Sequence, residues 1–177
     1  MRAKALLWTT GLVIGGYMVV AGYALTRQGI EPLLLCADKG GLAIPMPQHI
    51  CRQYLFAFRG TPDDIETLEQ GIGASFIVQG ESSKEDRSEV LAFLVERGLD
   101  PNHIDMHGLT PLHAAVLAND VEEARILLAH GARVDIQDRA HGLTALEFSR
   151  QLLEQNHADI ESREPLVTVL RDQGISP

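Results

Sequence analysis

The sequence predicts an all-helical fold, a solenoid of stacked helix pairs behind one apolar N-terminal helix. The segment from His107 to Asp138 carries the start, turn and stop signals of two short helices, and parts of the pattern recur before and after it. An uncharged run from Ala5 to Thr26 precedes them. We therefore divide the chain into an N-terminal transmembrane helix (1–27), a linker (28–53) and a repeat domain (54–177).

The clearest helix pair begins at Thr110. The hydroxyl of Thr110 can cap a helix because the first amides of a helix have no partner of their own. Pro111 then falls on the first helical position, where its fixed φ fits and its missing N–H costs nothing. Apolar residues recur at helical spacing through two helices. Gly131 ends the second helix, because glycine readily adopts the left-handed backbone of a helix stop.

This segment resembles an ankyrin repeat. Thr110-Pro111-Leu112-His113 matches the family's opening motif, and the second helix ends in Leu127-Leu128 and Gly131-Ala132 before a hairpin finger. The resemblance implies that Thr110, Pro111, His113 and Gly131 are structural, with His113 hydrogen-bonded within the turn. One repeat cannot bury its own apolar face, so neighbouring repeats are expected.

The flanking segments resemble such neighbours. Residues 142–146 repeat the opening of the best repeat, but Ala145 replaces the proline and Glu147 replaces the histidine. Thr144 and Glu147 instead predict a capping box. Residues 89–99 copy the second helix, and 166–170 form the last one. With a degenerate repeat over 54–71, a short helix at 76–78 and a polar loop at 81–86, we predict about four repeats with degenerate ends.

The N-terminal apolar run is long enough to cross a hydrocarbon core of about 30 Å at about 1.5 Å per residue. Arg2 and Lys4 precede it and an acidic remainder follows, which predicts a cytoplasmic N-terminus. We expect an uncleaved single-pass anchor in a bacterial inner membrane, with the soluble domain in the periplasm. The alternative is a secretory signal cleaved near Gly22-Tyr23-Ala24, although the run is long for that.

The two cysteines, Cys36 and Cys51, are close in sequence. In an exported compartment we expect them to form a disulfide, worth ~3 kcal/mol on the chain-entropy model for a short loop. The alternatives are two buried free thiols or a metal site. A metal site is the weaker alternative, since the chain has no further cysteine to complete a ligand set.

The composition argues against nucleic-acid binding. The chain has 15 Lys and Arg against 24 Asp and Glu, a net charge of −9. Binding to phosphates needs basic side chains, so a protein partner, steered by the acidic charge, is favoured instead. No catalytic motif is present, so we predict no enzyme and no cofactor. A metal or haem iron bound by His103, His107 and His141 is an alternative to polar turn tips in water.

In ankyrin repeats the fingers and the exposed side of the first helices bind other proteins. The resemblance therefore implies a partner-binding surface here, comprising His103, His107, Leu109, Leu117, Asp120, Asp138, Arg139, His141 and Leu143. Its three leucines are apolar at positions that the fold does not need, which suits the core of an interface. Scattered surface leucines are the alternative.

The layout also resembles two kinds of small bacterial protein. One is an immunity protein that neutralises a secreted antibacterial toxin, such as a type VI secretion phospholipase effector, on the periplasmic side. The other is an accessory protein that supports a periplasmic catalase or haem delivery. We favour immunity, because a periplasm-facing anchor holds an inhibitor where a membrane-attacking toxin arrives. A membrane scaffold with several weak partners is a third hypothesis.

Overall fold

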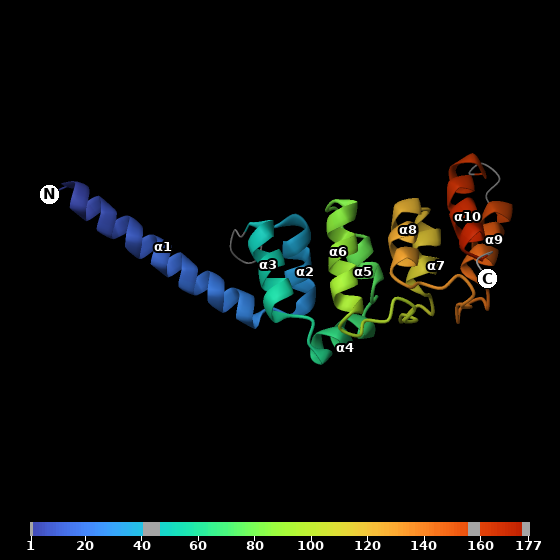
Figure 1. The fold of residues 1–177 in the computed structure, drawn as a ribbon, viewed down its shortest axis with the longest axis horizontal. Coiled ribbons are helices and arrows are strands. Elements are labelled where there is room, and N and C mark those ends of the chain that lie inside the picture. Colours follow the sequence, from blue (N-terminus) through green and yellow to red (C-terminus); the bar gives the residue numbers. More distant parts are fainter. Residues whose placement is uncertain (1, 41–46, 156–159, 175–177) are drawn as a thin grey trace. The chain divides into compact units, whose positions relative to one another are not determined.

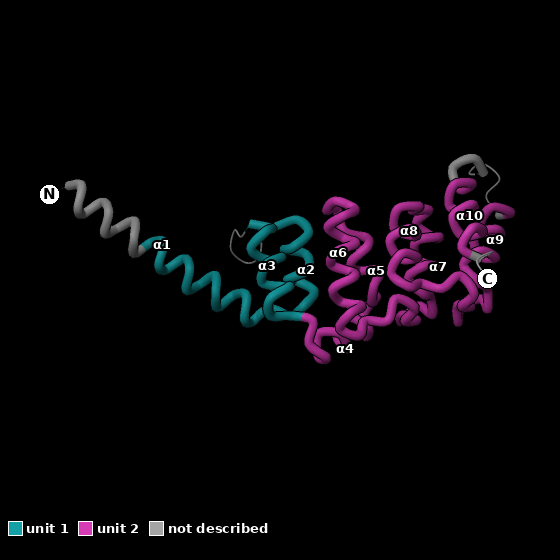
Figure 2. The backbone as a smooth tube through the Cα atoms, in the orientation of Figure 1, with its two compact units in different colours: residues 1–59 teal, residues 60–177 magenta. Residues whose placement is uncertain are grey.

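A computed structural model describes residues 2–40, 47–155 and 160–174 (Figure 1). Every regular element in these ranges is a helix, and one isolated bridge joins Gln137 to Thr144. The prediction of an all-helical fold is confirmed for the described residues. The chain divides into two compact units, residues 1–59 and residues 60–177 (Figure 2).

Unit 1 contains α1 (Arg2–Arg27), α2 (Ile30–Lys39) and α3 (Gln48–Phe58). Helices α2 and α3 pack against each other, and a disulfide joins Cys36 to Cys51 across a Cα–Cα distance of 5.7 Å. Leu33 and Leu55 are fully buried there. The segment predicted as a linker is therefore largely helical, because its apolar residues and its disulfide form a small core of their own.

The described side chains of α1 are largely apolar and exposed. From residue 13 to residue 23 the exposed set is Val13, Ile14, Tyr17, Met18, Val19, Val20 and Tyr23, whereas Ala21 and Leu25 are buried. Residues 5–12 of the predicted membrane span lie outside the residues whose side chains are described. Within the described ranges, none of the helices has the length and apolar character required to cross a membrane.

Unit 2 begins with α4 (Pro62–Gln70), which starts where the sequence predicts. The hydroxyl of Thr61 accepts a hydrogen bond from the Asp64 amide at 3.3 Å, and the Asp64 carboxylate accepts one from the Thr61 amide at 3.1 Å. This reciprocal pair satisfies amides that a helix start otherwise leaves unpaired. Ile65 and Leu68 face the core.

The rest of unit 2 consists of stacked helix pairs: α5 (Ser75–Val78) with α6 (Lys84–Val95), α7 (Pro111–Ala118) with α8 (Val121–Ala129), and α9 (Ala145–Gln155) with α10 (Ile160–Gly174). The first helices contact one another in the order α5, α7, α9, and the second helices in the order α6, α8, α10, so the pairs form two layers (Figure 1).

The described residues contain three such pairs, where the sequence predicts about four repeats. The difference lies at the N-terminal end. The sequence predicts a degenerate repeat over 54–71, but residues 54–58 belong to α3, which the disulfide and the apolar contacts pair with α2. Unit 2 accordingly starts at Gly60, where the sequence predicts residue 54.

The core of unit 2 lies between its two layers. Its fully buried large side chains include Leu91, Leu94, Leu112, Leu127, Leu166 and Leu170. Asn119 ends α7 with φ 56°, and Gly131 follows α8 with φ 95°. Both helix stops use the left-handed backbone, which asparagine and glycine tolerate best. The polar loop predicted at 81–86 is shorter, since Ser83 caps α6 through the Asp86 amide.

Candidate partner-binding surface

Two turns connect the helix pairs on the side where the sequence predicts fingers. The first finger turn is Asp105–Leu109. One carboxylate oxygen of Asp105 accepts hydrogen bonds from the His107 amide at 2.8 Å and the Leu109 amide at 2.9 Å. The Asp105 amide donates to the Leu109 carbonyl at 2.9 Å. These three bonds fix the turn from within, so its tip is presented in one conformation.

The second finger turn, Asp138–Leu143, repeats this design. Asp138 is 3% exposed, and its carboxylate accepts from the Leu143 amide at 2.8 Å, the His141 amide at 3.1 Å and His141 Nδ1 at 2.7 Å. Burial by itself would raise the pKa of Asp138, but the hydrogen bonds from Leu143 and His141 outweigh burial and hold that pKa below its ordinary value. Asp138 is therefore ionised, and its carboxylate stabilises the turn from the inside.

The two finger turns contact each other directly. The Arg139 amide donates to the Gly108 carbonyl at 2.7 Å. Gly108 has φ +80°, and a Cβ there would lie 3.3 Å from the Ala140 nitrogen and 3.3 Å from the Arg139 Cβ. A side chain at this position would therefore be strained and crowded. Glycine thus allows the two turns to approach closely.

His113 links the two helix pairs behind the fingers. It is 1% exposed; its Nδ1 lies 2.7 Å from the Thr110 hydroxyl and its Nε2 lies 2.9 Å from the Leu143 carbonyl. A carbonyl can only accept, so Nε2 carries the proton and Nδ1 accepts from Thr110. Burial lowers the pKa of His113, although the bond to Leu143 opposes this. The structural role that the resemblance implies for His113 therefore extends across repeats.

The predicted partner residues differ in accessibility. His107, Leu117, Arg139 and His141 are exposed, whereas His103, Leu109, Asp120 and Leu143 are half-buried and Asp138 is buried. His141 stacks on Phe148 with a ring separation of 5.4 Å. The exposed members lie on the finger turns and on α7, as the resemblance implies.

Two of the predicted partner residues also have structural roles. Asp138 braces the second finger turn and has almost no accessible surface to offer a partner. Asp120 caps α8, because its Oδ1 accepts from the amides of Glu122 at 2.8 Å and Glu123 at 2.9 Å. Aspartate serves equally well on a surface and at a helix cap, so residue type alone did not distinguish these roles.

The alternative of a metal site at His103, His107 and His141 is not supported. No group of three His, Cys, Asp or Glu side chains in the described part of the chain is arranged to hold a metal ion.

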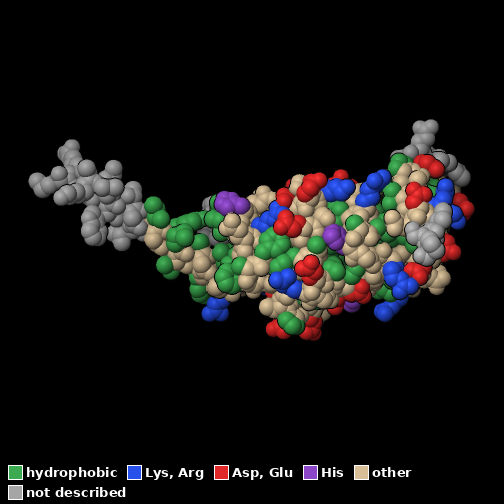
Figure 3. Space-filling model, viewed as in Figure 1, with side chains coloured by type: hydrophobic (Ala, Val, Ile, Leu, Met, Phe, Trp, Pro, Cys, Tyr) green, Lys and Arg blue, Asp and Glu red, His purple; other side chains and the backbone are tan. Residues whose placement is uncertain are grey.

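One exposed side chain of the first finger turn is not among the residues that the sequence predicts. Met106 is 76% exposed at the tip, between Asp105 and His107. An apolar residue inside a turn closed by aspartate was the signal that could have identified it. On the face of unit 2 visible in Figure 3, acidic and basic side chains are interspersed.

Residues 94–149 match the family model described as ankyrin repeats in many copies. This segment is therefore similar to ankyrin repeats. It extends from the end of α6 through both finger turns and the α7/α8 pair into α9. The match therefore covers the surface described above.

Curated relatives resemble the same region. An ADP-ribosylation factor GTPase-activating protein of Arabidopsis thaliana is 40% identical over 65 residues, covering 37% of this chain and 8% of that protein. The RelA-associated inhibitor of Mus musculus is 38% identical over 58 residues, covering 33% and 7%. An ankyrin repeat-containing protein of Schizosaccharomyces pombe is 30% identical over 84 residues, covering 44% and 40%. The chain thus spans less than half of each.

Proposed function

We propose that this chain is a membrane-held binding protein that neutralises a secreted antibacterial toxin through its finger surface. Ankyrin repeats are protein–protein interaction modules, and the match over residues 94–149 is the observation that carries the binding function. One matching relative is named as an inhibitor, which is the mode of action proposed here.

The geometry of the finger surface supports a preorganised interface. Asp105 and Asp138 hold both turns by internal hydrogen bonds, and the Arg139 amide joins one turn to the other. Preorganised backbone reduces the ordering cost of association, so more of the contact energy appears as affinity. Met106 at the tip and Leu117 on α7, the latter 54% exposed, supply the apolar contacts.

Two features of unit 1 support the location. The exposed apolar side chains of α1 from Val13 to Tyr23 favour an apolar environment over water. The Cys36–Cys51 disulfide favours an oxidising compartment such as the periplasm. A binder held at the inner membrane and facing the periplasm would meet a toxin that attacks that membrane, which is the argument for an immunity function.

The location is tested by fractionation of cells that express the full chain with a C-terminal tag. We expect the chain to stay in the membrane fraction after carbonate extraction. We also expect protease added to intact spheroplasts to degrade the tag. A tag that is protected from protease until the cells are lysed would contradict the periplasmic placement. A chain recovered entirely in the soluble fraction would contradict membrane attachment.

The partner is tested by affinity purification of the detergent-extracted full chain, followed by mass spectrometry. The matched variants are Met106→Asp with Leu117→Arg on the finger surface, and Lys84→Glu at an exposed position of α6. We expect one stoichiometric partner that the finger variant loses and the α6 variant keeps. If both variants retained the partner, the interface would have to lie outside the finger surface. A co-purified catalase in place of a toxin would favour the accessory function.

A further inference from the structure

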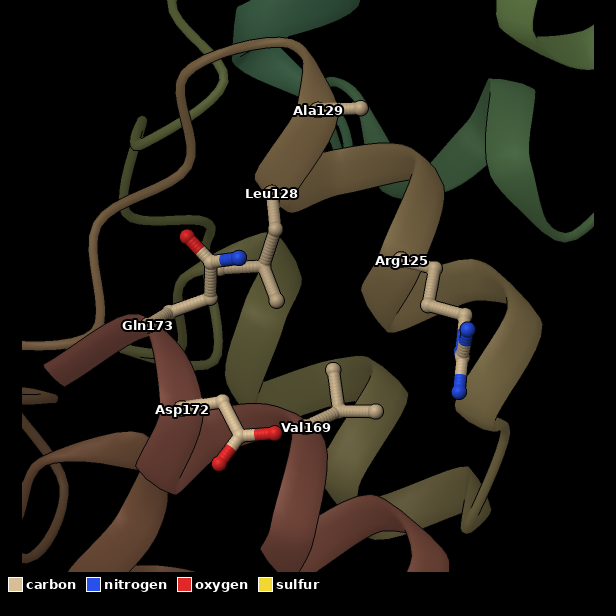
Figure 4. Close-up of a pocket in the computed structure, with 6 residues that line it drawn as sticks. All are labelled: Arg125, Leu128, Ala129, Val169, Asp172 and Gln173. Atoms are coloured by element: carbon tan, nitrogen blue, oxygen red, sulfur yellow. The ribbon is translucent and has the colours of Figure 1, made fainter. Parts of the chain in front are cut away.

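A groove lies between α8 and α10, in the layer of second helices. It has a volume of about 410 Å³ and is lined by Arg125, Leu128, Ala129, Val169, Asp172 and Gln173 (Figure 4). Each helix contributes three residues at positions i, i+3 and i+4, which share one face of a helix. The first helices and Leu117 belong to the other layer, so the groove is separate from the surface formed by α7 and the finger turns.

The floor of the groove is apolar and its sides are charged. Leu128 and Val169 are half-buried and Ala129 is exposed, which gives a short apolar strip along both helices. Arg125 and Asp172 lie on opposite sides of Val169 (Figure 4). Within the described ranges neither side chain forms an ion pair or a hydrogen bond, so both charges face the groove and solvent.

We infer that this groove is a second docking surface, which accepts one helix of a protein partner bearing an acidic, an aliphatic and a basic residue in succession. The aliphatic side chain packs against Leu128 and Val169, while the carboxylate pairs with Arg125 and the basic group pairs with Asp172. The groove holds opposite charges apart across an apolar strip, so it is complementary to a helix with one acidic and one basic residue. A helix whose charged residues all have the same sign would meet repulsion from either Arg125 or Asp172.

A helix fits the groove better than an extended strand. Side chains of α8 and α10 at i, i+3 and i+4 form ridges with a furrow between them, and a third helix packs by placing its own ridge in such a furrow. The partner then supplies anchors at i, i+4 and i+7 from one face, the usual pattern of a helix bound in a groove. With the finger surface free on the other layer, the module would hold two partners at once.

The test uses the full chain in detergent and three labelled helical peptides, with binding followed by fluorescence anisotropy. The peptides carry Glu-Leu-Lys, Glu-Leu-Glu or Lys-Leu-Lys at the three anchor positions and are otherwise identical. Wild type is expected to prefer the Glu-Leu-Lys peptide by about tenfold over the other two, since one attractive rim pair is replaced by a repulsive one.

Charge-reversal variants make the test specific. Asp172→Lys should shift the preference to the Glu-Leu-Glu peptide, and Arg125→Glu should shift it to the Lys-Leu-Lys peptide. Ala129→Trp should fill the groove and abolish binding of all three peptides. Circular dichroism should show that each variant remains folded, because the three substituted positions are exposed on their helices. Equal affinity of wild type for all peptides, or unchanged binding to Ala129→Trp, would overturn the proposal and leave the finger surface untouched.

Discussion

The charge of the buried Glu123 should affect the stability of unit 2. Glu123 lies in the first turn of α8, is 6% exposed, and its Oε2 has no hydrogen-bond partner among the described residues. Burial and the neighbouring Asp120 raise the pKa of Glu123 to about 7, against the opposing effect of Arg87 on α6. An ionised carboxylate is therefore poorly accommodated at this position.

The sign of the pH dependence follows from this raised pKa. Between the ordinary value of 4.5 and about 7, the folded protein holds a proton that the unfolded chain has released. The free energy of unfolding thus falls as pH rises through that window, and the loss is complete above about pH 7. Since a tenfold change in proton affinity corresponds to about 1.4 kcal/mol, ionised Glu123 costs up to roughly 3 kcal/mol at pH 8.

The substitution Glu123→Gln removes the charge and keeps the size of the side chain. We expect the free energy of unfolding of the variant to exceed that of wild type by up to roughly 3 kcal/mol at pH 8. Below pH 4.5 the two free energies should differ little. Urea unfolding of unit 2, followed from pH 4 to pH 8, measures the difference. The control Glu122→Gln alters a surface residue whose carboxylate pairs with Arg87 at 2.6 Å, and it should change stability by less than about 1 kcal/mol.

The reasoning would be refuted by unfolding free energies of wild type and Glu123→Gln that run parallel across the whole pH range. It would also be refuted if glutamine lowered stability at pH 8. Either result would mean that ionised Glu123 is paired or solvated in the folded protein. A changed dependence on urea concentration would instead indicate that the substitution altered the compactness of a state.

Three further predictions concern stability, all measured by thermal or urea unfolding. Leu127→Ala should cost about 2–5 kcal/mol, because Leu127 is fully buried and the cavity cannot collapse completely; a cost below 1 kcal/mol would contradict its place in the core. Thr110→Ala should cost at least about 1 kcal/mol through the lost cap and the lost partner of His113. The Cys36→Ser, Cys51→Ser double variant should destabilise unit 1 by ~3 kcal/mol and leave unit 2 unchanged, and a parallel loss in unit 2 would contradict the division of the chain.

Local signals in the sequence were sufficient for much of the fold. The starts of α4, α7 and α9 follow from Thr61, Thr110 and Thr144, because a hydroxyl cap satisfies amides only a few residues away. The partner of α3 could not be predicted in this way. It depends on apolar contacts with α2 as well as on the Cys36–Cys51 disulfide, and the predicted disulfide alone did not show that both segments are helices packed on each other.

The candidate site was predictable to a lesser extent. The resemblance placed the finger turns correctly in sequence, since Asp105, Gly108 and Leu109 are matched in type by Asp138, Gly142 and Leu143. It did not separate side chains that face outward from those that brace the turn. A carboxylate that accepts hydrogen bonds from the backbone amides of the turn is turned inward, and only the three-dimensional structure shows which carboxylates do so.

The hydrogen bond from His113 to the Leu143 carbonyl means that the opening turn of one repeat is completed by the repeat that follows it. At the equivalent position of the last pair, Glu147 takes the place of the histidine. Its carboxylate accepts from the Thr144 amide at 2.9 Å and from the Thr144 hydroxyl at 2.8 Å, so the turn is complete within itself. A histidine at this position needs a carbonyl from the following repeat to accept its hydrogen bond, whereas a glutamate finds its donors within its own turn. Whether an opening turn depends on the following repeat is thus decided by the one side chain that stands at this position, His113 or Glu147.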